Sequence, residues 1–213
     1  MRTYQEVKKA VLNQGFRWFS APYSLNNVWE RTSNVITNKF TDFRHICWLD
    51  DKGVEHILSL PATTKPGLYK SILEPVTVNG ITGTAVIKFP QQVIGGWQFR
   101  DTNKEFSHYP YFRQVKPADY LRDGDKDNMI DEPDCDDKDK YECPEVDDSI
   151  FGTHWHIMSR PGTYGSGLVN NWSKGCCGQP EPEYEKTLEI TRKSAALYGN
   201  KFTGTFLKSE HFK

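Results

Sequence analysis

Two short apolar segments on either side of a tight turn constrain the fold of this chain more than any other feature. They are FRHICWL at residues 43–49 and VEHILSL at residues 54–60, and the connection between them is DDKG. Segments of this length that are rich in aliphatic and aromatic residues and bounded by Asp and Gly are typical of β-strands. The sequence therefore predicts a β-hairpin over residues 43–60.

Helices and further strands are predicted elsewhere along the chain. Two helices are predicted at residues 4–14 and 181–198, because apolar residues recur on one face and a glycine follows each segment. The predicted fold class is β-rich α+β, with a helical and irregular lead-in at residues 1–38 before one domain at residues 39–213. Further strands are predicted at residues 76–78, 82–89, 109–115, 151–158 and 201–207.

The composition argues against several classes of protein. The mean hydropathy is −0.68, and no apolar run approaches the roughly 20 residues that span a bilayer. The first residues, MRTYQEVKKAVLNQGF, lack the apolar core of a signal peptide. We therefore expect a chain that is made in the cytoplasm and does not insert into a membrane. Its basic residues are too dispersed to predict a nucleic-acid partner.

Negative charge is concentrated in residues 123–148, where thirteen Asp and Glu residues stand against three Lys. Residues 123–134 match much of an EF-hand calcium loop, with carboxylates at positions one, three, five, nine and twelve. A Ca²⁺ ion here would have a structural role, since the carboxylates would otherwise repel one another. The alternative is a solvated acidic surface loop. The predicted ligands are Asp123, Asp125, Asp127, Met129, Asp131 and Asp134.

The five cysteines do not form a framework typical of secreted proteins. Cys47 lies in a predicted strand, where we expect it to be buried. Cys135 and Cys143 could pair in an oxidising compartment, although a cytoplasmic origin argues against it. Cys176 and Cys177 are adjacent, and adjacent cysteines rarely bridge each other.

The segment at residues 151–179, FGTHWHIMSRPGTYGSGLVNNWSKGCCGQ, carries the most reactive residue types. His154 and His156 are two positions apart in a predicted strand, so both side chains would lie on the same face. A thiol becomes a good nucleophile when a base or a cation lowers its pKa and a turn exposes it. Three interpretations are open: a nucleophilic Cys176, a zinc site, or buried structural side chains. The zinc site is the least favoured, because its spacing fits no standard zinc module; its ligands would be His154, His156, Cys176 and Cys177.

The order of these residues resembles the catalytic signature of L,D-transpeptidases. Ser173-x-Gly175-Cys176 follows His156, and Ser173 lies 17 positions after that histidine. In that family a cysteine attacks a carbonyl of a peptidoglycan stem peptide, and an upstream histidine accepts the thiol proton. The resemblance implies Cys176 as nucleophile, His156 as base and Ser173 as supporting hydroxyl, with the backbone N–H groups of Gly175 and Cys176 stabilising the oxyanion. It also implies a β-sandwich fold with a C-terminal helix packed on it.

The chain departs from that signature beside the thiol. Lys174 replaces the histidine of the family's turn, and the Arg or Asn that follows the family's cysteine is missing. We expect Lys174 to lower the pKa of Cys176 and Arg160 to bind the substrate carboxylate instead. The predicted substrate-binding residues are His154, Arg160, Trp172 and Lys174.

The whole chain also resembles a group of phage and prophage proteins with the same layout. Across most of its length the matching motifs are KKAVLNQGF, TDF, ATTKPGLY, GTAV, RDGDKDNMID, FGTHWHI, WSKGC and ALYGNKFTGTF. This resemblance implies a cell-wall context, with peptidoglycan and other virion proteins as partners. The predicted function is therefore a cysteine-dependent peptidoglycan hydrolase of the L,D-peptidase type. The alternative is a non-catalytic phage structural or wall-binding protein that keeps the fold.

Overall fold

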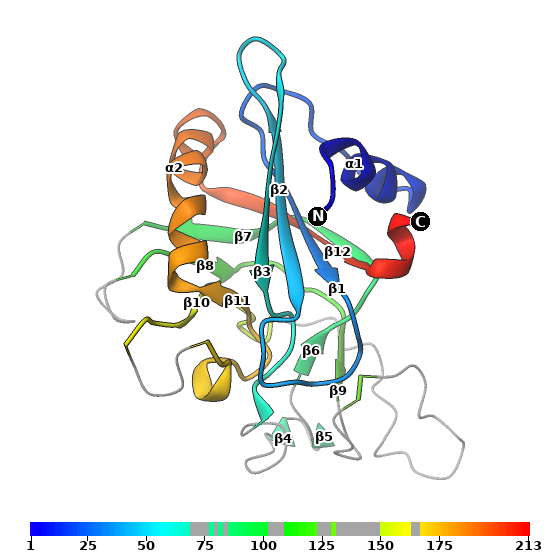
Figure 1. Cartoon of the computed structure of the whole chain (residues 1–213), viewed down its shortest axis with the longest axis vertical. Coiled ribbons are helices and arrows are strands. Elements are labelled where there is room, and N and C mark those ends of the chain that lie inside the picture. Colours follow the sequence, from blue (N-terminus) through cyan, green and yellow to red (C-terminus); the bar gives the residue numbers. More distant parts are fainter. Residues whose placement is uncertain are drawn as a thin grey trace.

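The computed structural model describes residues 1–68, 77–78, 81–82, 85–101, 109–122, 129–130, 150–162 and 167–213. Its largest element is a sheet of eight strands in the order β11-β10-β8-β7-β12-β1-β2-β3. Two small two-stranded sheets, β4–β5 and β6–β9, lie at one end of the molecule (Figure 1). The β-rich α+β class predicted from the sequence is confirmed. The strands of the large sheet are β1 (Asn26–Arg31), β2 (Asp42–Leu49), β3 (Glu55–Ala62), β7 (Gln91–Arg100), β8 (Tyr111–Gln114), β10 (Trp155–Ser159), β11 (Cys177–Pro180) and β12 (Lys201–Lys208).

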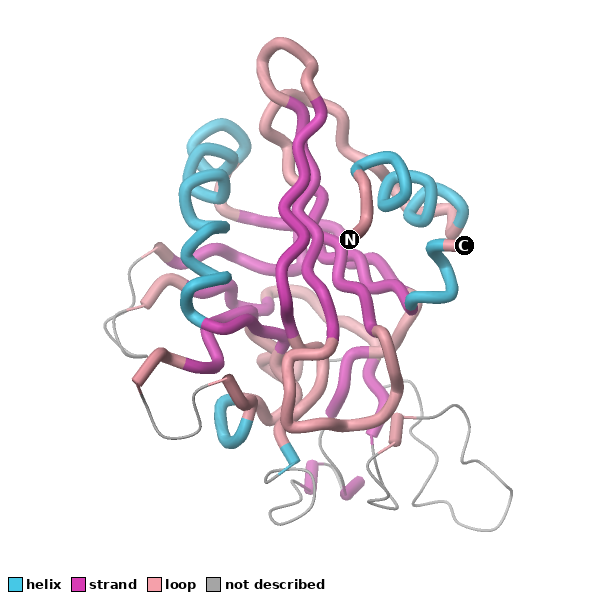
Figure 2. The backbone as a smooth tube through the Cα atoms, in the orientation of Figure 1, coloured by secondary structure: helices cyan, strands magenta, loops and turns pink. Residues whose placement is uncertain are grey.

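The remaining elements are short, apart from two α-helices. Both helices lie on the outside of the strands, α1 beside the C-terminal end of the chain and α2 on the opposite side (Figure 2). Within the described ranges, neither combines the length and apolar character needed to cross a membrane. These elements are α1 (Tyr4–Asn13), α2 (Glu181–Tyr198), β4 (Thr77–Val78), β5 (Ile81–Thr82), β6 (Ala85–Ile87), β9 (Tyr120–Arg122) and the 3-10 turns η2 (Asn170–Trp172) and η3 (Ser209–Phe212).

The predicted hairpin is confirmed as β2 and β3, which pair antiparallel along their whole length. Its tip is held by Asp50, whose Oδ1 accepts hydrogen bonds from the backbone N–H groups of Lys52 and Val54, both at 2.9 Å. Gly53 has φ +77°, a conformation that glycine adopts without strain.

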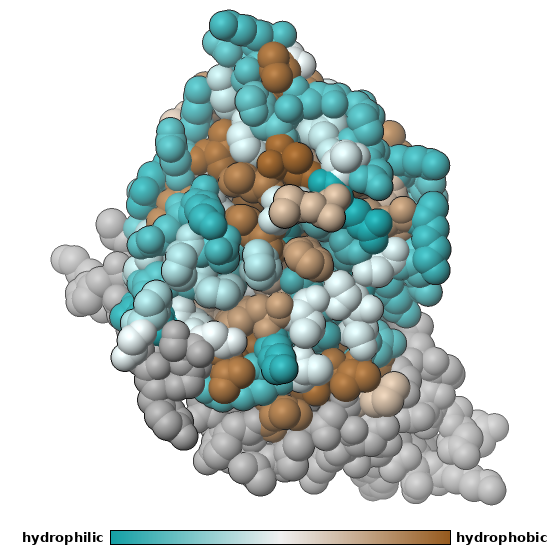
Figure 3. Space-filling view, viewed as in Figure 1, coloured by the Kyte–Doolittle hydropathy of each residue, from teal (hydrophilic) through white to brown (hydrophobic). Residues whose placement is uncertain are grey.

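Apolar side chains in the middle of the face shown in Figure 3 are surrounded by hydrophilic ones.

Both predicted helices are also confirmed. A reciprocal capping box starts α1: the backbone N–H of Glu6 donates to Oγ1 of Thr3, and the backbone N–H of Thr3 donates to Oε2 of Glu6. One face of α1 packs on the sheet through the buried side chains of Val7 and Val11. Gly199 follows α2 with φ +83°, as the sequence predicted for a helix end.

Strand β1 was not predicted, yet it lies in the middle of the large sheet. It runs parallel to β12 and antiparallel to β2, so the segment before residue 39 contributes a central strand. All six of its residues are buried, including Glu30 and Arg31. A strand whose polar residues are all buried has no alternation of polar and apolar side chains, which explains why the sequence pattern did not reveal it.

The large sheet curls until its two outer strands approach each other. Thr63, directly after β3, forms a bridge with Gly178 of β11. The backbone N–H of Thr63 donates to the carbonyl of Gly178 at 2.8 Å, and the reverse bond measures 2.9 Å. This pair of bonds closes the sheet and brings the ATTKPG segment beside the strand that follows Cys176.

Aromatic rings from β1, β7, β8, β10 and β12 fill the interior of the curled sheet. Trp97 stacks on Trp155 with ring centroids 4.6 Å apart, and Trp29 lies 5.5 Å from Trp155. Gly204 provides the space for these rings, since a Cβ atom there would lie 2.7 Å from both Trp97 and Trp155. The fully buried guanidinium of Arg44 packs against Trp155 and donates to Oδ1 of Asn27 at 2.7 Å. Such close packing fixes the positions of the strands, including β10.

Candidate functional site

The strand predicted to carry the two histidines and the strand that follows Cys176 are neighbours in the large sheet. Strand β10 pairs parallel with β11, with Trp155 opposite Cys177 and His156 opposite Gly178. The backbone N–H of Cys177 donates to the carbonyl of His154 at 3.1 Å. This register places His154 beside Cys176.

The two faces of these strands have different environments. Trp155 and Cys177 are fully buried in the aromatic interior. Because side chains alternate along a strand, His154, His156 and Cys176 lie on the opposite face. The structure therefore brings the predicted base and nucleophile to one side of the sheet.

A short turn holds the thiol at the start of β11. Oγ of Ser173 donates to the carbonyl of Cys176 at 2.9 Å and accepts from the backbone N–H of Gly175 at 3.1 Å. Gly175 has φ +111°, a backbone conformation that favours glycine. The supporting role that the resemblance implied for Ser173 is thus a structural one, because its hydroxyl closes the turn.

The ATTKPG segment supports this turn from the other edge of the sheet. The backbone N–H of Gly67 donates to the carbonyl of Ser173 at 3.3 Å. Gly67 lies so close to the 3-10 turn η2 that a Cβ atom would come within 1.9 Å of the Asn170 carbonyl oxygen. No other residue fits at this position without moving the backbone.

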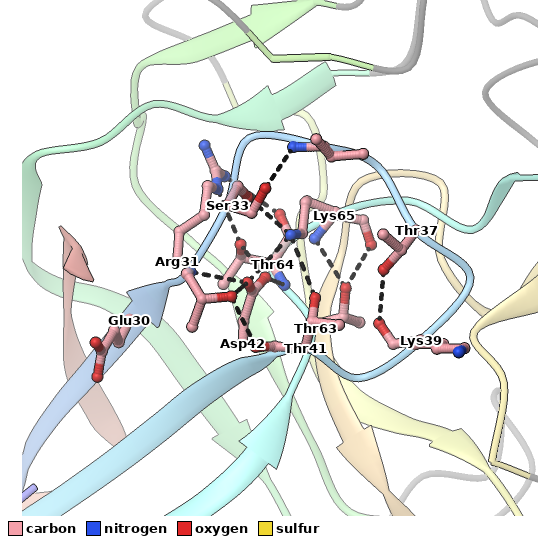
Figure 4. A network of polar contacts seen from close by, with 12 residues as sticks. Glu30, Arg31, Ser33, Thr37, Lys39, Thr41, Asp42, Thr63, Thr64 and Lys65 are labelled. Carbon is pink, nitrogen blue, oxygen red and sulfur yellow. Dashed lines mark hydrogen bonds and ion pairs between the residues drawn. The ribbon is translucent and has the colours of Figure 1, made fainter. Parts of the chain in front are cut away.

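A buried ion pair anchors the supporting segment (Figure 4). Nζ of Lys65 lies 3.1 Å from Oδ1 of Asp42, and both side chains are excluded from solvent. Oδ2 of Asp42 accepts from the backbone N–H of Thr64 at 2.9 Å and from its hydroxyl at 2.8 Å. Lys65 also donates to the carbonyl of Ser33 at 2.8 Å. These bonds fix the segment that carries Thr63 and Gly67.

The thiol of Cys176 is partly buried. Its Sγ atom accepts a hydrogen bond from the backbone N–H of His154 at 3.4 Å and lies 3.8 Å from the carbonyl oxygen of Gly152. Burial raises the pKa of Cys176 to about 11, and the His154 N–H offsets this only in part. The expectation that Lys174 lowers this pKa was wrong, because the loss of hydration outweighs any attraction from the exposed ammonium group.

His156 presents a lone pair at Nε2. Its Nδ1 lies 2.6 Å from the carbonyl oxygen of Ile157, which only accepts hydrogen bonds, so Nδ1 carries the proton. Burial lowers the pKa of His156, which favours the neutral ring. A neutral imidazole with a free Nε2 lone pair is the form that acts as a general base.

His154 has the opposite arrangement of protons. Its Nδ1 accepts from the backbone N–H of Gln114 at 3.4 Å, so the proton of the neutral ring is on Nε2. Burial, His156 and Arg113 together lower the pKa of His154 to about 4. The two histidines therefore offer different groups at neutral pH: a lone pair from His156 and an N–H from His154.

The four predicted zinc ligands do not gather around one point. Cys177 faces the aromatic interior, away from the two histidines, and burial raises its pKa well above the ordinary value. Among the residues that the structure describes, no three His, Cys, Asp or Glu side chains are placed to share a metal ion. These four side chains therefore do not form one metal site in the described part of the chain.

The other predicted substrate-binding residues lie in different places. Arg160 follows the far end of β10, and the six residues from His154 to Arg160 span roughly 20 Å of extended chain. Its guanidinium is engaged with Glu181 at 3.6 Å and with the ring of Tyr109. Lys174 is exposed in the turn itself, and Trp172 is partly buried at the end of η2.

Two residues on this face were not singled out from the sequence. Strand β8 pairs antiparallel with β10, with Phe112 opposite Trp155. This register places Arg113 opposite His154, and the ring of Tyr111 meets His154 edge-on with centroids 5.4 Å apart. The alternation of buried Phe112 with exposed Arg113 was visible in the sequence, but the neighbouring strand was not.

Most of the predicted calcium loop lies outside the described residues. This applies to Asp123, Asp125, Asp127, Asp131 and Asp134, and also to Cys135 and Cys143. Met129 forms a bridge with Val35, and Ile130 is buried against Ile36. Ile130, the eighth residue of the predicted loop, is thus a core residue, and calcium binding stays a prediction.

Comparisons of the chain with protein-family models, curated proteins and solved structures give no match.

Proposed function

We propose that the protein is a cysteine-dependent acyl-transfer enzyme that hydrolyses peptidoglycan stem peptides, with a fold related to L,D-transpeptidases and a phage-associated role. The observation that carries this proposal is that a turn-held thiol and a neutral imidazole lie on the same face of two neighbouring strands. Within the part of the chain that the structure describes, nothing binds Nε2 of His156, and Cys176 directly precedes the neighbouring strand β11. The peptidoglycan substrate and the phage setting rest on the sequence resemblance.

The protonation states support a general-base mechanism. With its pKa raised to about 11, Cys176 is a thiol at neutral pH, and His156 is uncharged because burial lowers its pKa. Nε2 of His156 takes the thiol proton as Sγ bonds to the stem-peptide carbonyl carbon. The tetrahedral intermediate expels the amine, which leaves with that proton, and a thioester remains. His156 then takes a proton from water, whose hydroxyl releases the acid and regenerates the thiol.

The backbone of the turn provides one donor for the oxyanion. Within the described part of the chain, no group accepts a hydrogen bond from the backbone N–H of Cys176. The N–H of Gly175 is already bonded to Oγ of Ser173. The oxyanion hole that the resemblance to L,D-transpeptidases implies therefore has one available backbone N–H group rather than two.

Purified sacculi test the proposal. The wild-type protein is expected to release muropeptides that mass spectrometry identifies by the bond cut, and Cys176→Ala is expected to release none while keeping its melting temperature. Cys47→Ala is the matched control, because Cys47 is a buried thiol on β2 that does not share this face. Release by Cys176→Ala would contradict the proposal.

The alternative function is a wall-binding or virion structural protein without catalysis. The outward position of Arg113 and Lys174 around the thiol is compatible with binding an anionic wall polymer. Such a protein would sediment with sacculi and release nothing, in the wild type as in the variants.

A further inference from the structure

The tetrahedral intermediate of acyl transfer needs preorganised donors where its negative charge develops. The N–H of Gly175 already donates to the Ser173 hydroxyl, so of the two turn amides the N–H of Cys176 is the one left to bind the oxyanion. A second donor must come from another element on the same face of the sheet.

His154 is the candidate for this donor because of its place beside the thiol. The parallel register puts it directly beside Cys176, and its own backbone N–H bonds to Sγ. Its Nδ1 is held by the N–H of Gln114, and among the described residues the Nε2–H group has no acceptor, so this group is left to donate.

The surroundings of His154 keep the ring in place. Oε1 of the buried Gln114 side chain accepts from the backbone N–H groups of Gly152 and Thr153, both at 3.0 Å, and so fixes the chain just before the histidine. The edge of Tyr111 packs against the ring itself. A donor that is positioned in advance does not reorganise during the reaction.

We propose that the Nε2–H group of His154 is a second oxyanion donor and therefore a catalytic residue beside His156. The two histidines then have different roles: His156 removes the thiol proton, and the uncharged His154 donates a hydrogen bond to the developing oxyanion. Because the pKa of His154 is lowered to about 4, the ring stays neutral throughout the physiological range. This inference rests on the proposed function, since it assigns a role within acyl transfer.

Two probes of the same thiol separate this role from a structural one. p-Nitrophenyl acetate acetylates Sγ through a tetrahedral oxyanion: the S–C bond forms, the C–O bond breaks, nitrophenolate leaves and His156 takes the thiol proton. Iodoacetamide alkylates Sγ by displacing iodide, and no oxyanion forms. The ratio of the two rates, measured by mass spectrometry on the peptide that contains Cys176, therefore reports oxyanion stabilisation.

His154→Phe keeps a flat ring and removes the donor, whereas His154→Gln keeps an N–H group at a similar reach. We expect the ratio of acetylation to alkylation to fall about 100-fold in His154→Phe and to recover most of this loss in His154→Gln. An unchanged ratio in His154→Phe would overturn the proposal, and so would an equal fall of both rates in both variants. A wild-type thiol that is never acetylated would instead contradict the proposed acyl-transfer function itself.

Discussion

Lys65 and Asp42 form an ion pair that is excluded from solvent, with Nζ and Oδ1 3.1 Å apart. The pair lies behind the segment whose residues Thr63 and Gly67 bind the strand and turn around Cys176. Removing one partner would leave a buried charge without compensation. The stability of the fold and the shape of the candidate site should therefore depend on the same contact.

Replacing Lys65 with Met is expected to lower the free energy of unfolding by about 3–5 kcal/mol, because Asp42 would stay buried without its cation. The double variant Lys65→Met/Asp42→Asn should be less destabilised than the sum of the two single variants. Urea unfolding measures all three. Lys52→Met, at the exposed hairpin tip, is the control and should stay within about 0.5 kcal/mol of the wild type. Additive effects of the two single substitutions would show that the pair does not couple.

Glu30 should make stability depend on acidic pH. Burial raises its pKa, but hydrogen bonds from His45, Arg2 and Ser209 outweigh burial and lower it to about 2. A carboxylate with a lowered pKa stabilises the fold above its unfolded value of about 4.5, and this contribution is lost as the pH falls toward 2.

The wild type should therefore exceed Glu30→Gln by about 3 kcal/mol in unfolding free energy at pH 7, and the difference should shrink between pH 4.5 and pH 2. Chemical denaturation across this range tests the prediction. Glu189→Gln, on the exposed side of α2, should show no such trend. A difference that does not change with pH would contradict the role of Glu30.

The reactivity of Cys176 should rise with pH far beyond the range of an ordinary thiol. Because its pKa is raised to about 11, the rate of alkylation by iodoacetamide should increase about tenfold per pH unit and should still be rising steeply at pH ~10. The unfolded chain is the matched control, and its thiols, with a pKa of about 8.5, should level off near pH ~9.5. A plateau below pH 8 in the folded protein would mean that the thiolate is stabilised.

Gly175→Ala should damage the site more than the fold. Alanine at φ +111° costs about 1–2 kcal/mol and shifts the turn that holds the thiol, so thioester formation at Cys176 should fall at least tenfold. Gly53→Ala carries the same kind of backbone strain at the remote hairpin tip, at φ +77°. Mass spectrometry of the acylated protein should show normal acylation in Gly53→Ala. Equal losses in both variants would contradict a local effect.

Calcium should raise the melting temperature. The carboxylates predicted to bind the ion at residues 123–134 repel one another, and a bound cation removes this repulsion. Thermal unfolding with millimolar CaCl₂ and with EDTA tests the prediction, with MgCl₂ as the control because Mg²⁺ demands a smaller, octahedral site. No shift at millimolar calcium would contradict the site.

Local patterns were sufficient to predict the hairpin, both helices and the last strand, because each has its own turn or cap. Strand β1 was not predicted because Asn27, Glu30 and Arg31 are buried with polar partners. In this strand a polar residue type therefore did not indicate an exposed position. Of the candidate site, His156 and Cys176 could be found from their order in the sequence. The proton positions on the two histidines and the place of Arg113 depend on strand register, which no local signal encodes.

The bridge between Thr63 and Gly178 has a consequence for the order of folding. It joins segments far apart in the sequence, and contacts of this kind form late because their loop-closure entropy is offset only when the intervening strands have paired. The turn that holds Cys176 depends on this closure through Gly67. Until the sheet closes, we expect Cys176 to be an ordinary solvated thiol, so a misfolded or half-folded chain would carry the proposed nucleophile without the surroundings that would direct it.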